Sequence, residues 1–225
     1  MRYWVVDSET TGVESQDKAV EVAGFFCEDN TIIDHYQSLV NPGIPIPPQA
    51  SAIHHLVDDD VKDAPSIEDA MAPFFDQEFD FVVAHNAAFD KRFMDFGQAP
   101  WACTWKLAMR VYPDAPSHSN QFLRYFLKLP SPVHAKNMAP HRAPYDSEVS
   151  TYLFQHLLSK ATTDEPLEAM LKVSNNPLLL KKCGFGKHKG QLWSDVPRSY
   201  LDFILHKSSG WDENVLHTAR HYYGS

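Results

Sequence analysis

One stretch near the start of the chain, Tyr3–Gly12 (YWVVDSETTG), constrains the fold more than any other. Its apolar half predicts a strand, which ends in two acids, Asp7 and Glu9, followed by a turn. Because successive side chains of a strand alternate between faces, both acids project from the face that carries Tyr3 and Val5. The apolar side chains of the other face indicate a strand buried on both sides. Taken alone, such a pair is more typical of a strand that enters a polar turn than of a functional site.

Strands and helices alternate over the rest of the first 160 residues. Strands are predicted over Ala19–Cys27, Thr31–Val40, Phe79–Ala84 and Trp101–Thr104, and helices over 64–75, 87–96, 106–111, 121–127 and from Tyr145 onward. The short link at 28–30 predicts an antiparallel hairpin between the second and third strands. The later β-α alternation predicts parallel pairing, so we expect an α/β fold with a mixed sheet.

Two further aspartates occupy positions that face the predicted core. Asp90 lies near the start of the helix predicted over 87–96, beside its apolar stripe, and Asp146 lies on the inward face of the helix that starts at Tyr145. An acid in the first turn of a helix complements the helix dipole by about 0.3–1 kcal/mol, which is sufficient reason for either residue alone. It does not explain why both point toward the core, where an unpaired charge is costly.

A metal site accounts for all four acids together. Carboxylates about 4 Å apart repel one another by roughly 4 kcal/mol per pair at an effective dielectric constant of 20, so a cluster of Asp7, Glu9, Asp90 and Asp146 requires cations. Carboxylate oxygens with open coordination positions suit Mg²⁺ or Mn²⁺. Two such ions, about 3.5–4 Å apart, are the usual apparatus for in-line attack on a phosphodiester.

His141 is the candidate for a base that activates water. It precedes Asp146 by five residues and lies in the Pro- and His-rich segment 130–144, which predicts a long loop. A histidine on a flexible loop could swing toward the metal site, and its ordinary pKa suits proton transfer near neutrality. The alternative interpretation is a surface histidine in a chain that has twelve of them.

Three segments resemble the exonuclease motifs of the DEDDh (DnaQ-like) 3′–5′ exonuclease superfamily. They are DSETTG (Asp7–Gly12), VAHNAAFD (Val83–Asp90) and HRAPYD (His141–Asp146), in the family's order. Two more segments, at 45–56 and 103–113, are similar to regions that follow the first and second motifs in that family, so the resemblance covers about residues 1–160. The pattern FGKHKG at 185–190 is similar to the tail of the exonuclease X branch.

The resemblance implies a ribonuclease-H-like fold, with a mixed five-stranded sheet flanked by helices. It implies a nucleic acid with a free 3′ end as partner, DNA favoured, and release of nucleoside 5′-monophosphates. It assigns Asp7, Glu9, Asp90 and Asp146 as ligands of two Mg²⁺ or Mn²⁺ ions and His141 as the general base. RNA 3′-end trimming or polymerase proofreading is the alternative within the family, and an inactive nucleic-acid-binding scaffold is the alternative outside it.

Two positions depart from the family pattern, and several residues are candidates for substrate contact. Ser8 replaces the usual Thr, Val or Ile, which we expect to affect packing, and Pro144 replaces a frequent Leu, which leaves the mobility of His141 open. The residues expected to contact the substrate lie in the turn after the first strand, in the segment 45–56 and in the basic tail: Thr10, Gly12, His54, Lys187 and Lys189.

Length and composition predict two domains. The predicted boundaries are an exonuclease domain over 1–160, a helical linker over 161–176, with a helix at 162–173, and a small α+β C-terminal module over 177–225, which begins with a strand over Leu178–Phe185. The net charge of −9 gives no general attraction for nucleic acid. Three widely spaced cysteines, no signal-peptide pattern and no long apolar run predict buried free thiols, a cytoplasmic location and no membrane partner.

Overall fold

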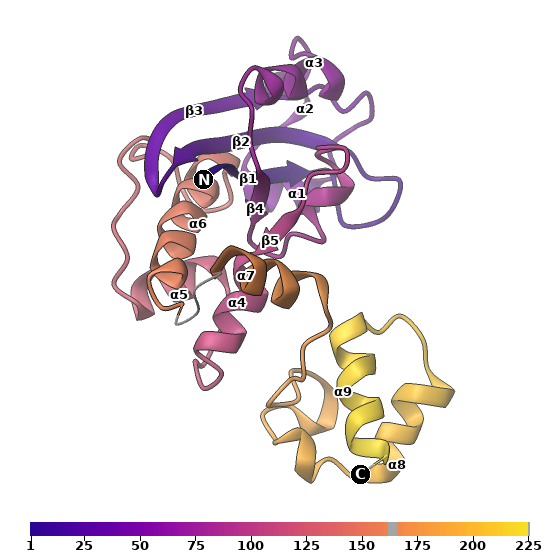
Figure 1. Ribbon diagram of the computed structural model, residues 1–225. Helices are drawn as coiled ribbons and strands as arrows, with labels where there is room; N and C mark the ends of the chain where they lie inside the picture. Colours follow the sequence, from indigo (N-terminus) through magenta and orange to yellow (C-terminus); the bar gives the residue numbers. More distant parts are fainter. Residues whose placement is uncertain (162–165, 225) are drawn as a thin grey trace. The chain divides into compact units, whose positions relative to one another are not determined.

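The computed structural model describes residues 1–161 and 166–224 (Figure 1). It divides into two compact units, Met1–Leu171 and Lys172–Ser225. Among the described helices, none is long and apolar enough to cross a membrane. The three cysteines are buried and free, as predicted.

The first unit is built on a mixed five-stranded sheet in the order β3-β2-β1-β4-β5, which confirms the predicted fold class (Figure 1). The strands are β1 (Arg2–Thr10), β2 (Ala19–Glu28), β3 (Thr31–Leu39), β4 (Phe81–Ala84) and β5 (Trp101–Cys103). β1, β2 and β3 are antiparallel neighbours, as the predicted hairpin requires. β1 pairs with β4, and β4 with β5, in parallel.

The alternation of side chains along β1 divides the core into two layers. Trp4 and Val6 pack against a cluster that includes Phe74, from the 3₁₀-helix η1 (Ala72–Phe75). On the opposite face, the ring of Tyr3 lies 5.2 Å from that of Phe154, in helix α6 (Ala143–Leu158). The acids of β1 therefore share a face with α6, which carries Asp146.

The remaining helices of this unit are short. They are α1 (Pro48–His54), α2 (Asp58–Val61), α3 (Ile67–Met71), η2 (Asp90–Arg92), α4 (Thr104–Val111) and α5 (Asn120–Phe126). Ser66 caps α3 as its sequence position suggests, because its hydroxyl accepts the N–H of Asp69 at 3.2 Å. The helix predicted over 87–96 is wrong. Asn86 adopts a left-handed backbone with φ of 63°, and a turn and one 3₁₀ turn with i→i+3 hydrogen bonds follow it.

The second unit is helical around Trp193, which is fully buried. Its elements are η3 (Gly186–His188), η4 (Trp193–Asp195), α8 (Arg198–Asp202), the π-helix η5 (Phe203–Lys207) and α9 (Glu213–Gly224), and α7 (Pro166–Asn175) leads into it. Residues 162–165 of the helix predicted over 162–173 lie outside the described residues.

The strand predicted over Leu178–Phe185 is wrong, and with it the α+β character of the module. Between residues 172 and 224 the only β pairing is an isolated bridge between Lys182 and Leu192. Side chains of α9 satisfy the backbone that a partner strand would have paired: the N–H of Leu178 donates to Asn214, and that of Leu180 to Thr218.

Candidate active site

Three of the four predicted ligands converge at the end of β1. One carboxylate oxygen each of Asp7, Glu9 and Asp146 can be chosen so that all three lie within 4.8 Å of one another. Asp7 and Glu9 are half-buried on the face of β1 that α6 covers, and Asp146 is buried in the first turn of α6. Strand alternation and the docking of α6 thus bring together residues that are 139 positions apart in the chain.

Hydrogen bonds fix the carboxylate of Asp146 from both sides. The side-chain amide of Gln121, in α5, donates to Oδ1 at 2.6 Å, and the backbone N–H of His141 donates to Oδ2 at 2.7 Å. Asn120 also donates to the carbonyl oxygen of Asp146 at 3.0 Å. No sequence pattern indicated Asn120 and Gln121, because their contacts with Asp146 depend on how α5 packs against α6.

Asp90 is not one of the three convergent carboxylates, but it lies close enough to Asp7 for its charge to raise the pKa of Asp7. It is 2% exposed, and its Oδ1 accepts a hydrogen bond of 2.8 Å from the hydroxyl of Ser8. By strand alternation Ser8 points to the face of β1 opposite Asp7 and Glu9, and its hydroxyl holds the carboxylate of Asp90. The expectation that Ser8 serves packing alone is therefore wrong, since it holds one oxygen of a predicted ligand.

Burial gives these acids unusual protonation behaviour. It raises the pKa of Glu9 to about 8 and that of Asp90 to about 7, and the charges of neighbouring acids add to the effect on Glu9. The pKa of Asp7 is also raised well above its ordinary value, first by burial and then by the charge of Asp90, and burial raises the pKa of Asp146. A group of oxygen ligands whose negative charges are this costly fits a divalent cation such as Mg²⁺ or Mn²⁺.

His141 is exposed beside this cluster, and hydrogen bonds to neighbouring elements hold the loop that carries it. The carboxylate of the fully buried Glu148 accepts the backbone N–H groups of Val133, His134 and Ala135. Arg124 donates to the hydroxyl of Ser131 at 2.6 Å. With the bond from the N–H of His141 to Asp146, hydrogen bonds hold the segment 130–142 at three places.

A pocket of about 370 Å³ adjoins the acid cluster. Its lining includes Glu9, the turn that follows β1, part of α1 and Phe89. The predicted contacts Thr10, Gly12 and His54 all lie in this lining. A Cβ at Gly12 would lie 2.5–2.9 Å from the carboxylate atoms of Asp17, so a larger residue there would displace that side chain.

His54 is a buried polar residue in the lining of this pocket. It is 1% exposed, and its Nδ1 accepts the backbone N–H of Leu56 at 3.1 Å, which assigns the ring proton to Nε2 in the neutral form. Burial lowers the pKa of His54, and an interaction with the backbone of Thr10 partly offsets this. The neutral form therefore presents an N–H donor on the Thr10 side of the ring.

Residues 4–154 match the model of the family described as Exonuclease, RNase_T. The chain belongs to this exonuclease family.

Individual relatives agree with that assignment. The exonuclease is 33% identical to Exodeoxyribonuclease 10 of Escherichia coli K12, over 97% of each chain. It is 32% identical to part of a PolC-type DNA polymerase III of Staphylococcus saprophyticus, over 70% of this chain and 11% of the polymerase. The solved structure of Exonuclease X in complex with 5′ overhanging duplex DNA matches with a TM-score of 0.67 and 33% identity, over 76% of this chain and 99% of that one. The exonuclease is thus a 3′–5′ enzyme of the DEDDh superfamily, close to exonuclease X, whose members use divalent metal ions.

The two predicted contacts of the second unit belong to a compact turn of the exonuclease. Lys187 and Lys189 are exposed, and the ammonium of Lys187 lies 5.4 Å from the ring centre of Tyr200. Gly186, with φ of 60°, cannot be replaced without strain, because a Cβ there would lie 2.4 Å from the hydroxyl of Tyr200. The turn is therefore a preformed part of the unit.

Proposed function

We propose that this exonuclease hydrolyses DNA from the 3′ end, at single strands or duplex ends, and releases nucleoside 5′-monophosphates by a two-metal mechanism. The observation that carries the proposal is the convergence of Asp7, Glu9 and Asp146 within 4.8 Å beside a pocket. The preference for DNA is supported by the relative named Exodeoxyribonuclease 10 and by the Exonuclease X structure solved with duplex DNA.

The four acids would hold the ions. Asp7, Glu9 and Asp146 present convergent oxygens, and Asp90, oriented by Ser8, would complete the set. Bound Mg²⁺ or Mn²⁺ supplies Lewis-acid stabilisation of the charge that develops on the phosphate and on the leaving oxygen. His141 accepts the proton of the attacking water, and its exposure beside Asp146 leaves the ring free to release that proton to solvent.

The pocket beside Glu9 would hold the 3′-terminal nucleotide. Thr10 and Gly12 bring their backbone close to the nucleotide, and the buried N–H of His54 supplies a hydrogen-bond donor. Ile53, which is 51% exposed, and Phe89 offer apolar surface to a base without selecting its identity. Lys187 and Lys189 would contact backbone phosphates farther along the substrate.

The decisive experiment is a time course on matched 3′- and 5′-labelled DNA and RNA, single-stranded and duplex, with Mg²⁺, with Mn²⁺ and with EDTA. We expect mononucleotides from the 3′ end of DNA, no product in EDTA, and no product from Asp7→Asn. The matched control Asp59→Asn removes the same charge from an exposed surface pair with Lys62 and should retain activity. Faster release from RNA would favour the RNA-trimming alternative, and polynucleotide binding without product would favour the inactive scaffold.

A polymerase-associated proofreading role is a second candidate, favoured by the similarity to part of a DNA polymerase. Preferential release of a mismatched over a paired 3′ nucleotide from duplex DNA would support it.

A further inference from the structure

A buried acid that the sequence analysis overlooked lies next to the active site. Glu21, on β2, is 3% exposed and stands directly opposite Glu9 in the antiparallel register. Like charges opposite one another on adjacent strands destabilise a sheet, and a buried carboxylate requires a partner. The buried carboxylate of Glu21 therefore requires a cationic or hydrogen-bonding partner.

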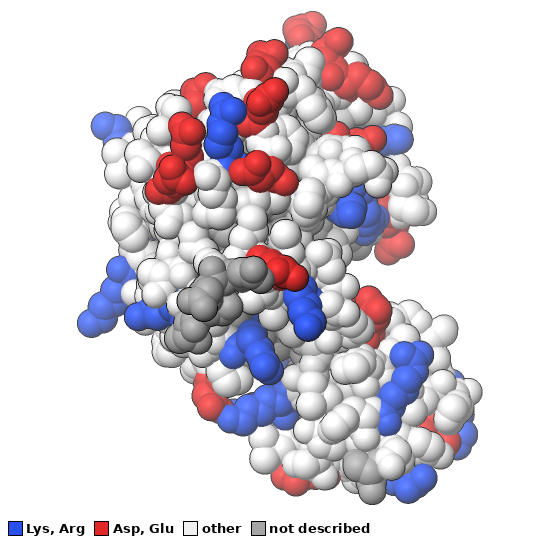
Figure 2. Space-filling model, viewed as in Figure 1, with Lys and Arg blue, Asp and Glu red and all other residues white. Residues whose placement is uncertain are grey.

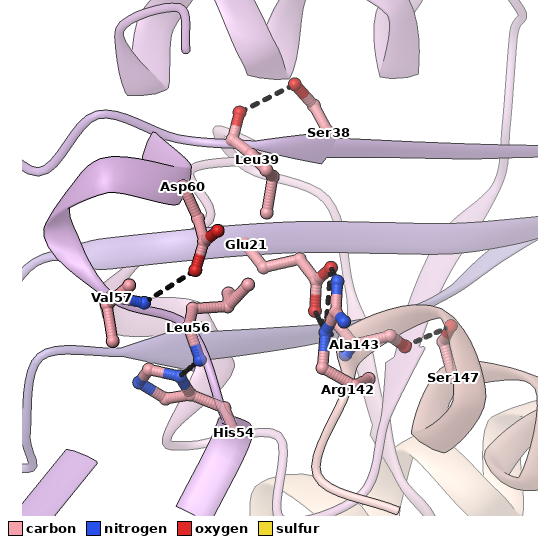
Figure 3. A network of polar contacts seen from close by, with 10 residues as sticks. All are labelled: Glu21, Ser38, Leu39, His54, Leu56, Val57, Asp60, Arg142, Ala143 and Ser147. Atoms are coloured by element: carbon pink, nitrogen blue, oxygen red, sulfur yellow. Dashed lines mark hydrogen bonds and ion pairs between the residues drawn. The ribbon is translucent and has the colours of Figure 1, made fainter. Parts of the chain in front are cut away.

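The partner of Glu21 is Arg142, the residue that follows His141 (Figure 3). Nε of Arg142 donates to both carboxylate oxygens, at 3.2 and 3.0 Å, and Nη2 donates to Oε1. This two-pronged geometry fixes orientation as well as distance, because the guanidinium is planar and rigid. We call these two residues the Glu21–Arg142 pair.

The same carboxylate also caps α6. Oε2 of Glu21 accepts the backbone N–H of Ala143 at 2.9 Å, at the first position of the helix, where Arg142 as N-cap supplies no side-chain cap of its own. A carboxylate is favourable at a helix N-terminus, because it satisfies an unpaired N–H and complements the helix dipole. Glu21 thus holds two consecutive residues, 142 and 143, through one side chain.

These contacts flank the backbone of His141, whose side chain is exposed. Its own N–H is bound by Asp146, and the next two residues are bound by Glu21. Its backbone has φ of 65°, a left-handed conformation that is uncommon for a residue other than glycine. Such a conformation persists where the surroundings determine it, and the Glu21–Arg142 pair is the contact that determines it from the helix side.

We propose that Glu21 and Arg142 are positioning residues of the nuclease reaction, which fix the backbone of 141–143 and thereby aim the His141 side chain at the acid cluster. This inference rests on the proposed function in one respect, the role of His141 as general base. Glu21 is the strand partner of Glu9, and the charges of Glu21 and Arg142 act on the pKa of Glu9 in opposite directions. The hydrogen bonds of the two side chains described above go to each other and to Ala143.

The first test is independent of activity. Amide hydrogen exchange of the metal-free protein should show faster exchange over 136–143 in Glu21→Gln and in Arg142→Lys than in the wild type. Glu28→Gln is the matched control, because Glu28 lies on the same strand and faces an arginine, Arg2, at 3.9 Å on the surface. Unchanged exchange over 136–143 in both pair variants, each verified as folded by circular dichroism, would overturn the inference.

The second test separates positioning from a structural role. We expect Glu21→Gln to lower kcat by about 10–100-fold, the scale on which orienting partners of functional groups act, with KM changed less than about threefold. In a His141→Ala background the same substitution should cost less than about twofold further, since the group it positions is gone. Glu21→Asp, which keeps the carboxylate, should recover part of the rate, and Glu28→Gln should match the wild type.

The outcomes distinguish this inference from the proposed function. If Glu21→Gln lowers kcat equally with and without His141, the pair acts through something other than the histidine and the inference fails. If His141→Ala alone costs less than tenfold, the base assignment fails, whereas the exchange experiment still decides whether the pair fixes the loop.

Discussion

The two units of this exonuclease differ in the sign of their charge. Residues 1–171 contain 12 Lys and Arg against 25 Asp and Glu, a net charge of −13, and residues 172–225 contain eight against four, a net charge of +4. Figure 2 shows acidic side chains gathered at the top of the first unit, where α2 carries three successive aspartates. An acidic surface repels a polynucleotide at long range, so the first unit attracts its substrate only where cations or local donors act.

This difference in net charge suggests that the two units have different roles. The first unit holds the carboxylates that we propose as metal ligands, and the second carries a local excess of lysine and arginine that can contribute to salt-dependent binding. Variants of the two units should therefore affect different measurements: substitutions in the first should change turnover, and substitutions in the second should change the salt dependence of binding.

The largest expected effect on kcat among these variants follows removal of the proposed general base, His141. His141→Ala should lower kcat by roughly 10²–10⁴-fold, the usual contribution of a general base, with the salt slope of DNA binding unchanged. Single-turnover kinetics and binding titrations over 50–200 mM salt measure both quantities. The exposed His217, on α9, provides the control His217→Ala, which should retain the wild-type rate. A loss below tenfold in His141→Ala would return that histidine to a structural role.

The next effect concerns the stability of the metal-free protein. In the folded state the pKa of Glu9 is raised to about 8 and that of Asp90 to about 7. Below pH 4 both groups are protonated in the folded and in the unfolded state, and their contribution to the free energy of unfolding is fully present. This contribution is lost as the pH rises through 7–8, because the folded state then has to ionise buried carboxyl groups. We expect Tm to fall by on the order of 5–10 °C between pH 5 and pH 9 in EDTA.

Two comparisons isolate this effect from other titrating groups. Mg²⁺ or Mn²⁺ at pH 9 should restore much of the lost Tm, because an ion bound only by the folded state stabilises it. Glu9→Gln should flatten the fall. An identical pH profile of Tm in Glu9→Gln and in the wild type would show that Glu9 is not held protonated.

A smaller effect tests the link between Ser8 and Asp90. Ser8→Ala removes a buried hydrogen bond to a carboxylate, worth about 1.5 kcal/mol or more, and should lower kcat by about tenfold while raising the metal concentration needed for half-maximal rate. Ser8→Thr keeps the hydroxyl and should stay near the wild-type rate. Equal rates in both variants at limiting Mg²⁺ would assign Ser8 to packing after all.

The smallest effect belongs to the second unit and completes the comparison. The double variant Lys187→Gln/Lys189→Gln should lower the salt slope of polynucleotide binding by roughly 1.5, since each phosphate contact contributes about 0.7–0.9. Cleavage of a dinucleotide should be unaffected. If the two lysines bind phosphates far from the 3′ end, a dinucleotide is too short to contact both the lysines and the active site. Lys62→Gln/Lys160→Gln, with exposed lysines of the first unit, is the matched control. An unchanged salt slope in the Lys187→Gln/Lys189→Gln variant would show that these two lysines do not bind the polynucleotide, and would contradict the proposed difference in role between the two units.

Local periodicity predicted the parts of this structure that depend on neighbouring residues. The alternation along β1 placed Asp7 and Glu9 on one face, and the spacing of apolar residues after Tyr145 identified α6. The structure brings both elements together as expected for a metal site. The roles of the individual ligands and of His141 stay predictions.

The parts that sequence reasoning missed depend on residues distant in the chain. Glu21 and Arg142 are 121 positions apart, and nothing in either segment indicates the other. The same holds for Gln121 and Asp146. The tail segment 178–185 has strand-like composition, but α9 supplies the partners for its N–H groups, so tertiary contacts override the local preference.

The hydrogen bonds on Asp146 have a consequence for ion selection. Its Oδ1 accepts the side-chain amide of Gln121 and, at 3.5 Å, that of Asn120, and its Oδ2 accepts the backbone N–H of His141, so the direction of this carboxylate is set before an ion arrives. A ligand with a fixed direction suits an ion that demands near-ideal octahedral geometry at about 2.0–2.1 Å, such as Mg²⁺. Ca²⁺ takes six to eight oxygens at about 2.3–2.6 Å in a more flexible geometry. We therefore expect the fixed direction of the Asp146 carboxylate to favour Mg²⁺ over Ca²⁺, two ions of equal charge that differ in radius.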